Sequence, residues 1–165
     1  MTIIDFKKGT SFEPVTDYHL ESIQDYLDEF FDGKELPSKL ISLLKTNNGG
    51  TPIQRYFPTK NNAYTIRVFY NISNNETIIL HESNEISDVH QFLEERLNND
   101  ALLPIAETRN GDVIVLDYEG TPKDNPRVSL WFHECDEDGV NSHPMEPIAE
   151  NMESFLSMLT ADFEE

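Results

Sequence analysis

Two absences limit what this chain can be: it has almost no cysteine and no long apolar run. Cys135 is the only cysteine among 165 residues, so no disulfide can form within the chain, which favours a reducing compartment. Residues 1–14 do not place a basic segment before the roughly 7–15 apolar residues of a signal peptide, and no window approaches the roughly 18 of a membrane span. We therefore expect a cytoplasmic protein with no membrane partner.

Basic residues are also scarce. Twelve Lys and Arg stand against 31 Asp and Glu, which gives a formal net charge of −19. Nucleic-acid binding depends on basic side chains that neutralise phosphates, so direct binding to nucleic acid is not expected. A basic protein would be attracted, and it would associate faster at low salt. Solubility alone is the other explanation of this charge.

The charge is concentrated in two segments. Seven acids and no Lys or Arg lie between Lys8 and Lys34, and ten acids lie from Glu134 to Glu165, beyond the last basic residue, Arg127. Both segments should project negative potential, so we expect partner-binding residues in them. The candidates are Asp25, Asp28 and Glu29 in the first segment, and Glu134, Asp136, Glu137 and Asp138 in the second.

Motifs of nucleotide-binding and hydrolytic enzymes are missing. The sequence has no Walker loop, no dinucleotide-binding glycine fingerprint and no G-x-S-x-G elbow. Cys135 could act as a nucleophile with His133 or His143 as its base, but its acidic neighbours disfavour the thiolate. The expectation is a protein with no catalytic residue.

The segment His133–His143 contains metal-ligand types without a complete pattern. His133, Cys135 and His143 could serve zinc, but neighbouring strand residues point to opposite faces and no C-x-x-C pair supports them. The stretch from Asp136 to Gly139 resembles part of a calcium loop, yet Met145 stands where the bidentate Glu is required. No metal and no cofactor is predicted.

Four segments carry apolar residues at helical spacing. The first runs from a cap at Asp17 to about Phe31 and ends at Gly33, and the second has Pro37 in its first turn. The expected helices and their apolar stripes are Asp17–Phe31 (Leu20, Ile23, Leu27, Phe30, Phe31), Pro37–Leu44 (Leu40, Ile41, Leu43, Leu44) with a stop at Asn47–Gly50, Ser87 or Asp88 to Leu97 (Val89, Phe92, Leu93, Leu97), and Ile148–Phe163 (Met152, Phe155, Leu156, Leu159, Phe163).

Other segments alternate as strands do, and Asn110-Gly111 is a strong hairpin signal. These features predict an α+β fold in which about four helices flank a mostly antiparallel sheet of about five or six strands. We expect one domain over residues 1–165, with 1–15 as an N-terminal lead. The expected strands are Ile53–Phe57, Tyr64–Ile72, Thr77–Leu80, Leu102–Thr108, Asp112–Tyr118 and Arg127–His133, and the expected core is Leu27, Leu44, Ile105, Ile114, Leu116, Trp131, Phe155 and Leu159.

Several of these pieces, taken in order, resemble the SUKH superfamily, which includes the yeast cell-wall regulators of the Smi/Knr type. The stretch from Leu36-Pro37 to Asn48-Gly49-Gly50 resembles its opening, and residues 103–117 resemble its hairpin. Residues 128–133 resemble the next strand, and residues 148–159 resemble the closing helix. The chain departs from the family pattern at Met152, where a Phe is usual, and in the long polar stretch 71–84.

The resemblance implies a non-catalytic α+β domain. Many bacterial members of the superfamily are immunity proteins that neutralise a polymorphic toxin, often a nuclease, from neighbouring cells. It therefore implies an inhibitor of a basic toxin, and the charge of this chain is in keeping with that partner. A regulatory or scaffold protein with an endogenous partner, as in the yeast branch, is the alternative.

Overall fold

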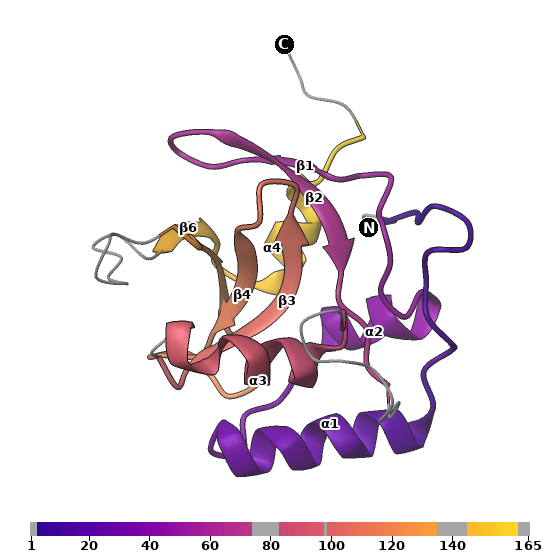
Figure 1. Ribbon diagram of the computed structural model, residues 1–165, viewed down its shortest axis with the longest axis vertical. Helices are drawn as coiled ribbons and strands as arrows, with labels where there is room; N and C mark the ends of the chain where they lie inside the picture. The colour runs from indigo at the N-terminus through magenta and orange to yellow at the C-terminus, as the bar shows by residue number, and fades with distance from the viewer. Residues whose placement is uncertain (1–2, 74–82, 98, 135–144, 162–165) are drawn as a thin grey trace.

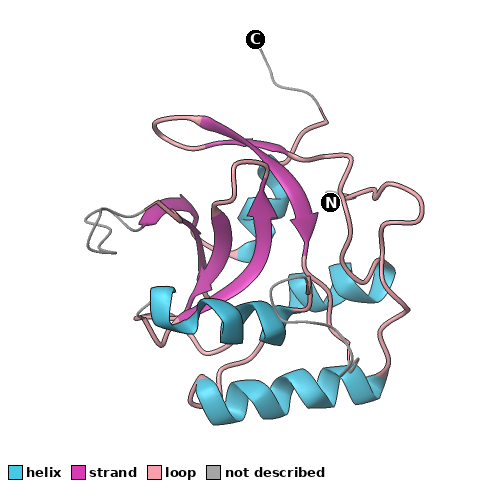
Figure 2. Cartoon of the chain, in the orientation of Figure 1, coloured by secondary structure: helices cyan, strands magenta, loops and turns pink. Residues whose placement is uncertain are grey.

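The computed structural model describes residues 3–73, 83–97, 99–134 and 145–161, and it shows an α+β fold (Figures 1 and 2). A six-stranded sheet has the order β1-β2-β3-β4-β5-β6, and every neighbouring pair is antiparallel. The predicted fold class is confirmed. The elements are α1 (Asp17–Phe30), α2 (Ser38–Thr46), β1 (Tyr56–Pro58), β2 (Ala63–Phe69), α3 (Ile86–Leu97), β3 (Leu102–Thr108), β4 (Val113–Asp117), β5 (Arg127–Trp131), β6 (Met145–Ala149) and α4 (Met152–Met158).

The hairpin predicted at Asn110-Gly111 joins β3 to β4. Gly111 has a φ of +90°, a conformation that costs glycine little because it has no Cβ. Thr108 stabilises the turn, because its backbone N–H donates to the carbonyl of Asp112 at 2.8 Å and its hydroxyl accepts the N–H of Asp112 at 3.1 Å. The local turn signal therefore sets the register next to the turn, where Glu107 pairs with Val113 and Ala106 with Ile114, and an irregularity between Pro104 and Ala106 shifts the register beyond it.

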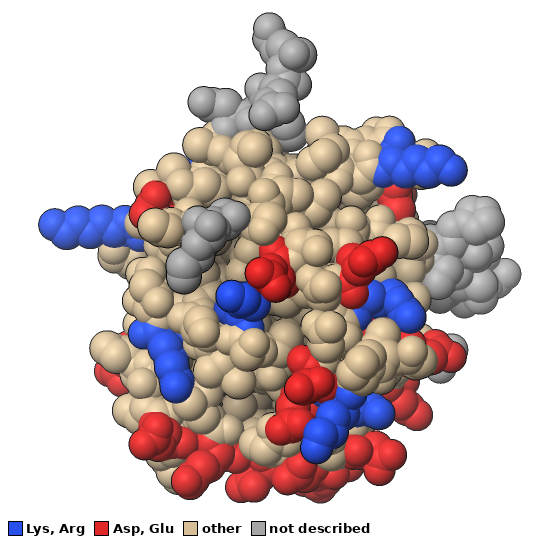
Figure 3. All heavy atoms as spheres, turned by 180° about the vertical axis from the view of Figure 1, so that it is seen from behind, with Lys and Arg blue, Asp and Glu red and all other residues tan. Residues whose placement is uncertain are grey.

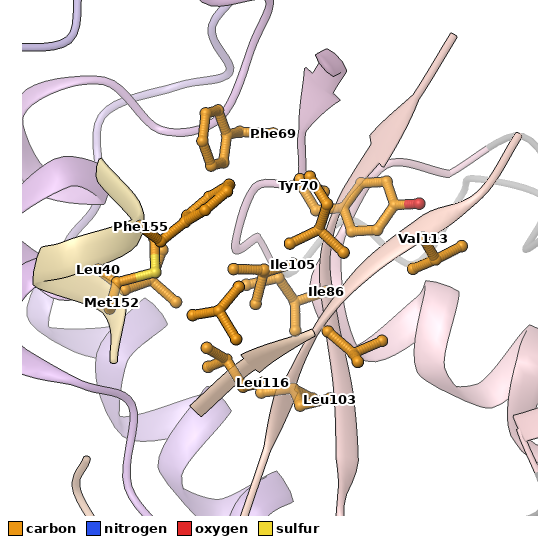
Figure 4. Packing of buried hydrophobic residues seen from close by; sticks show 14 of the residues in the cluster. Leu40, Phe69, Tyr70, Ile86, Leu103, Ile105, Val113, Leu116, Met152 and Phe155 are labelled. Atoms are coloured by element: carbon orange, nitrogen blue, oxygen red, sulfur yellow. The ribbon is translucent and has the colours of Figure 1, made fainter. Parts of the chain in front are cut away.

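Helices cover both faces of the sheet. Helix α3 lies across one face, while α4 and α2 lie on the other, where Met152 and Phe155 meet Leu40 and Phe69 (Figures 1 and 4). All five residues of β4 are consequently buried. Every predicted core residue is buried, which confirms that prediction: Leu27, Leu44, Ile105, Ile114, Leu116, Trp131, Phe155 and Leu159.

Helix α1 begins one residue earlier than expected. Thr16, not Asp17, is the N-cap, and it forms a capping box in which His19 bonds back to the backbone of Thr16. Phe30 was expected in the apolar stripe but is 44% exposed. The neighbouring Phe31 is the aromatic residue that is buried in the core. The ring of Phe31 lies 4.8 Å from His90, between centroids.

The buried face of α3 also differs from the predicted apolar stripe. Phe92 was expected to face inward, yet it is 53% exposed. The buried positions are Ile86, Val89, His90, Leu93 and Leu97, which recur every three or four residues and leave Phe92 to one side. Sequence reasoning did not consider His90 a core residue because histidine is polar.

The stop predicted for the second helix at Asn47–Gly50 is confirmed, with Asn47 as the C-cap, and Gly49 and Gly50 allow close backbone contact with β2. Helix α2 already ends at Thr46, and Asn47 follows in an extended conformation. A Cβ on Gly49 would lie 2.9 Å from the carbonyl oxygen of Phe69, and Gly50 exchanges backbone hydrogen bonds with the same Phe69. Both glycines therefore serve tertiary packing.

Asn48, between α2 and this contact, ties three segments together. Its amide nitrogen donates to the carbonyl of Glu13 at 2.7 Å and to that of Ile72 at 2.8 Å. Its amide oxygen accepts the N–H of Ile72 at 2.9 Å. The irregular N-terminal lead, the end of α2 and the segment after β2 are thus joined by one buried side chain.

The helix predicted over Ile148–Phe163 is wrong at its start. Residues 145–149 form β6, which pairs with β5, and α4 begins only after the N-cap Asn151. Pro147 lacks an N–H and therefore suits an edge strand such as this one. Among the other strands, Ile53–Phe57 appears as β1 at Tyr56–Pro58, and Thr77–Leu80 falls outside the described residues.

Candidate partner-binding surface

The outer face of α1 is acidic and has no basic side chain. Asp25, Asp28 and Glu29 are exposed and lie on one side of the helix, at spacings of three and four residues. In the described part of the chain, none of them forms an ion pair with Lys or Arg. In Figure 3, acidic side chains crowd the lower end of the molecule, the end where α1 lies in Figure 1.

Two of these carboxylates oppose the helix dipole. Asp28 and Glu29 stand in the last turn of α1, which contains no basic residue. The C-terminus of a helix carries partial negative charge, so carboxylates there are unfavourable by roughly 0.3–1 kcal/mol each at low ionic strength. Asp28 accepts one hydrogen bond, from Gln24 at 3.0 Å. These two charges therefore do not help to stabilise α1.

A cleft of about 850 Å³ adjoins this end of α1. Loops from two other parts of the chain complete it, and they add Asp100 and Glu119 to the carboxylates of α1. The only basic residue in its lining is Lys34. Sequence reasoning missed Asp100 and Glu119 because no local signal connects them to α1. The acidic residues of the cleft are Asp28, Glu29, Asp32, Asp100 and Glu119.

Beneath α1, the aromatic ring of Tyr26 reaches α3. Its hydroxyl is hydrogen-bonded to Nδ1 of His90, and the two rings meet edge to face with centroids 5.6 Å apart. Burial raises the pKa of the Tyr26 hydroxyl first, and the nearby carboxylates of Glu94 and Glu85 raise it further. The junction between α1 and α3 therefore lies in a negative field.

His90 is the buried titratable group at this junction. Burial lowers the pKa of its imidazole, while the carboxylates of Glu94 and Asp100 act in the opposite direction. The net result is a histidine that favours its neutral form in the folded protein.

Of the four partner-binding candidates predicted in the second acidic segment, only Glu134 is described. Glu134 is exposed, whereas Asp136, Glu137 and Asp138 lie outside the described residues. Arg96 of α3 donates to the carbonyl of His133 at 2.6 Å, so tertiary structure brings a cation beside the residue that precedes Glu134.

The histidine considered above as a base or a zinc ligand has a carboxylate partner. Nδ1 of His133 lies 2.6 Å from the buried carboxylate of Asp112, which also accepts the backbone N–H of His133. Cys135 and His143 lie outside the described residues. Within the described ranges, no three His, Cys, Asp or Glu side chains are grouped so as to hold a metal ion. Nor does any helix in those ranges combine the length and apolar character needed to cross a bilayer.

Comparison with known proteins bears on this fold. No curated protein and no solved structure matches the chain. A family model described as "SMI1 / KNR4 family (SUKH-1)" matches residues 14–158, which include every helix and strand described above. Because this match covers most of the sequence, the chain belongs to the SMI1/KNR4 family (SUKH-1).

Proposed function

We propose that this protein is an immunity-type inhibitor that binds and neutralises a basic toxin. The observation that carries the proposal is the acidic outer face of α1, with Asp25, Asp28 and Glu29 unpaired by any described cation. Two of these charges reduce the stability of their own helix, and binding to a basic partner would offset this cost. Family membership supports a protein-binding role without naming the partner.

Inhibition would be by occlusion. A toxin that cleaves nucleic acid must present Lys and Arg to phosphates, so its active-site cleft is positively charged. The α1 face would occupy this cleft and exclude the nucleic acid. Exposed charges at the rim raise the association rate, whereas those buried against an Arg or Lys of the toxin slow dissociation. The inhibitor would act in the cytoplasm, where the delivered toxin meets its substrate.

This mechanism requires no catalytic residue, metal or cofactor. Two buried carboxylates that could suggest chemistry, Asp112 and Asp117, have structural partners. Asp112 holds His133 and the β3–β4 turn, and Asp117 pairs with Arg127 of the neighbouring strand at 3.4 Å. The proposed activity is therefore binding alone.

The alternative is a regulatory or scaffold protein that binds an endogenous partner. Family membership fits this function equally well. A gene for a large secreted toxin immediately beside this one would favour the immunity function, and that toxin would supply the probe for the experiment.

The test is charge reversal on α1. Asp25→Lys, Asp28→Lys and Glu29→Lys are combined, and association with the toxin domain encoded beside the gene is measured at low and high salt. We expect association to slow at least tenfold at low salt and the salt dependence to fall, because steering by rim charges is lost. Reversal of Glu134, Asp136, Glu137 and Asp138 is the comparison variant. An unchanged rate for the α1 variant, with the fold intact, would remove α1 from the interface.

A further inference from the structure

A second surface, away from α1, contains a carboxylate without a cation. Glu146 of β6 is only 8% exposed, and its Oε1 accepts a hydrogen bond from the side-chain amide of Asn61 at 3.1 Å. No described residue donates a hydrogen bond to its other oxygen, Oε2. No ion pair joins Glu146 to any Lys or Arg of the described chain. Such a group is poorly solvated and unpaired, which is costly.

Glu146 lies in a groove of about 620 Å³, called the Glu146 groove here. The turn between β1 and β2 forms one side and β6 the other; in Figure 1 both lie at a distance from α1. Tyr64, Phe132, Met145 and Pro147 provide mostly apolar walls. The groove therefore offers aromatic rings and a methionine around one carboxylate.

The apolar walls and the single carboxylate of the groove favour a cation that has a flat or aliphatic apolar part. Nearby carboxylates make the surroundings negative, since Glu146 and Asp112 both raise the pKa of the Tyr64 hydroxyl, after the larger contribution of burial. A guanidinium stacks on aromatic rings and donates to a carboxylate at the same time, which an ammonium does less well. Lys60 also lines the groove but forms no ion pair with Glu146.

We propose that the Glu146 groove receives an arginine side chain of the protein partner, with the guanidinium bound to Oε2 of Glu146 and the stem packed against Met145 and Tyr64. The proposal rests on the protein-binding function but not on the acidic face of α1. The partner would thus be held at two places, by steering charges on α1 and by an inserted side chain here.

Methyl NMR of Met145 tests the proposal on the intact protein, which has only four methionines. The probe is N-acetyl-arginine N-methylamide, which resembles arginine within a chain, and its uncharged citrulline counterpart is the control. We expect saturable shifts at Met145 with the arginine probe and none with citrulline. Equal binding of the two would show an apolar groove alone and overturn the proposal, as would the absence of any saturable shift.

Two substitutions identify the carboxylate. Glu146→Gln keeps an oxygen for Asn61 and should weaken binding about tenfold, the usual scale for a hydrogen bond to a charged group. Glu150→Gln makes the same charge change at an exposed site just after β6 and should leave binding unchanged. Lys60→Ala should strengthen binding, because a like charge is removed from the groove. If Glu146→Gln binds as the unsubstituted protein does, the proposal is wrong.

The source of the arginine is tested by comparison with free arginine. Free arginine carries an α-amine and an α-carboxylate that an arginine within a chain lacks, so the blocked probe should bind at least as well if the groove is built for a protein side chain. Tighter binding of the free amino acid would identify a small-molecule site and overturn the proposal of a protein partner. A failure of the α1 variant to alter toxin association would leave these shifts unchanged, so the two proposals fail separately.

Discussion

All five residues of β4 are buried, whereas in α1 only Ile23 and Leu27 are buried among 14 residues. Strand β4 pairs on both sides and is covered on both faces, so nearly every atom contributes to stability. Helix α1 is attached along one stripe, and its other faces carry acids that its fold does not use. The centre of the sheet is therefore constrained by the core on every side, whereas most positions of α1 can change without loss of core contacts.

The largest expected effect on stability comes from shortening a buried side chain at the centre of the sheet. Leu116→Ala in β4, where Leu116 is fully buried, should lower the free energy of unfolding by about 2–5 kcal/mol through lost burial and a residual cavity. Tyr18→Ala on α1, where the ring is 66% exposed, should change it by about 0.5 kcal/mol or less. Urea unfolding of both variants measures the two changes in the free energy of unfolding. Similar losses would mean that α1 is as much a part of the core as β4.

A smaller effect on stability should come from lowering the pH, which protonates His90 at the junction between α1 and α3. Because burial keeps the pKa of His90 below that of an unfolded chain, the unfolded state binds more protons as the pH falls. The stabilisation is therefore present above the unfolded value of about 6.5 and is lost as the pH falls through the folded value, with a slope no steeper than about 1.4 kcal/mol per pH unit.

His90→Gln should flatten this dependence between pH 7 and pH 5, because glutamine does not titrate. Amide hydrogen exchange would locate the effect: α1 amides should lose protection before β4 amides, since Tyr26 and Phe31 of this part of the chain pack against His90. Equal loss of protection in both elements would show that His90 acts on the whole fold and not on α1.

The smallest effect concerns the helix dipole. Asp28→Asn with Glu29→Gln should stabilise the free protein by about 0.3–1 kcal/mol at low salt, because both acids stand at the negative end of α1. Asp17→Asn makes the same kind of change in the first turn and should destabilise it slightly. Thermal unfolding at low and high salt measures the stability change in each variant. The same sign at the two ends would contradict the dipole explanation.

Features that depend on neighbouring residues were predictable. The turn at Asn110-Gly111 set the β3–β4 register next to it, and periodic apolar residues located the core. Features that depend on distant pairing were not. Ile148 and Ala149 were predicted as the start of the last helix, but pairing with β5 places them in strand β6. Phe92 belongs to the apolar pattern of its helix, yet the direction in which α3 packs on β3 left it exposed.

The candidate site divides in the same way. Its charge and its location on α1 follow from the sequence, because the segment from Lys8 to Lys34 has no internal basic residue and its acids recur at helical spacing. The cleft required the tertiary structure, since Asp100 and Glu119 come from loops far along the chain. So did the Glu146 groove, whose carboxylate and amide are 85 residues apart in sequence. Local spacing determines which residues share a face, but only long-range packing decides which faces meet and which charges remain without a partner.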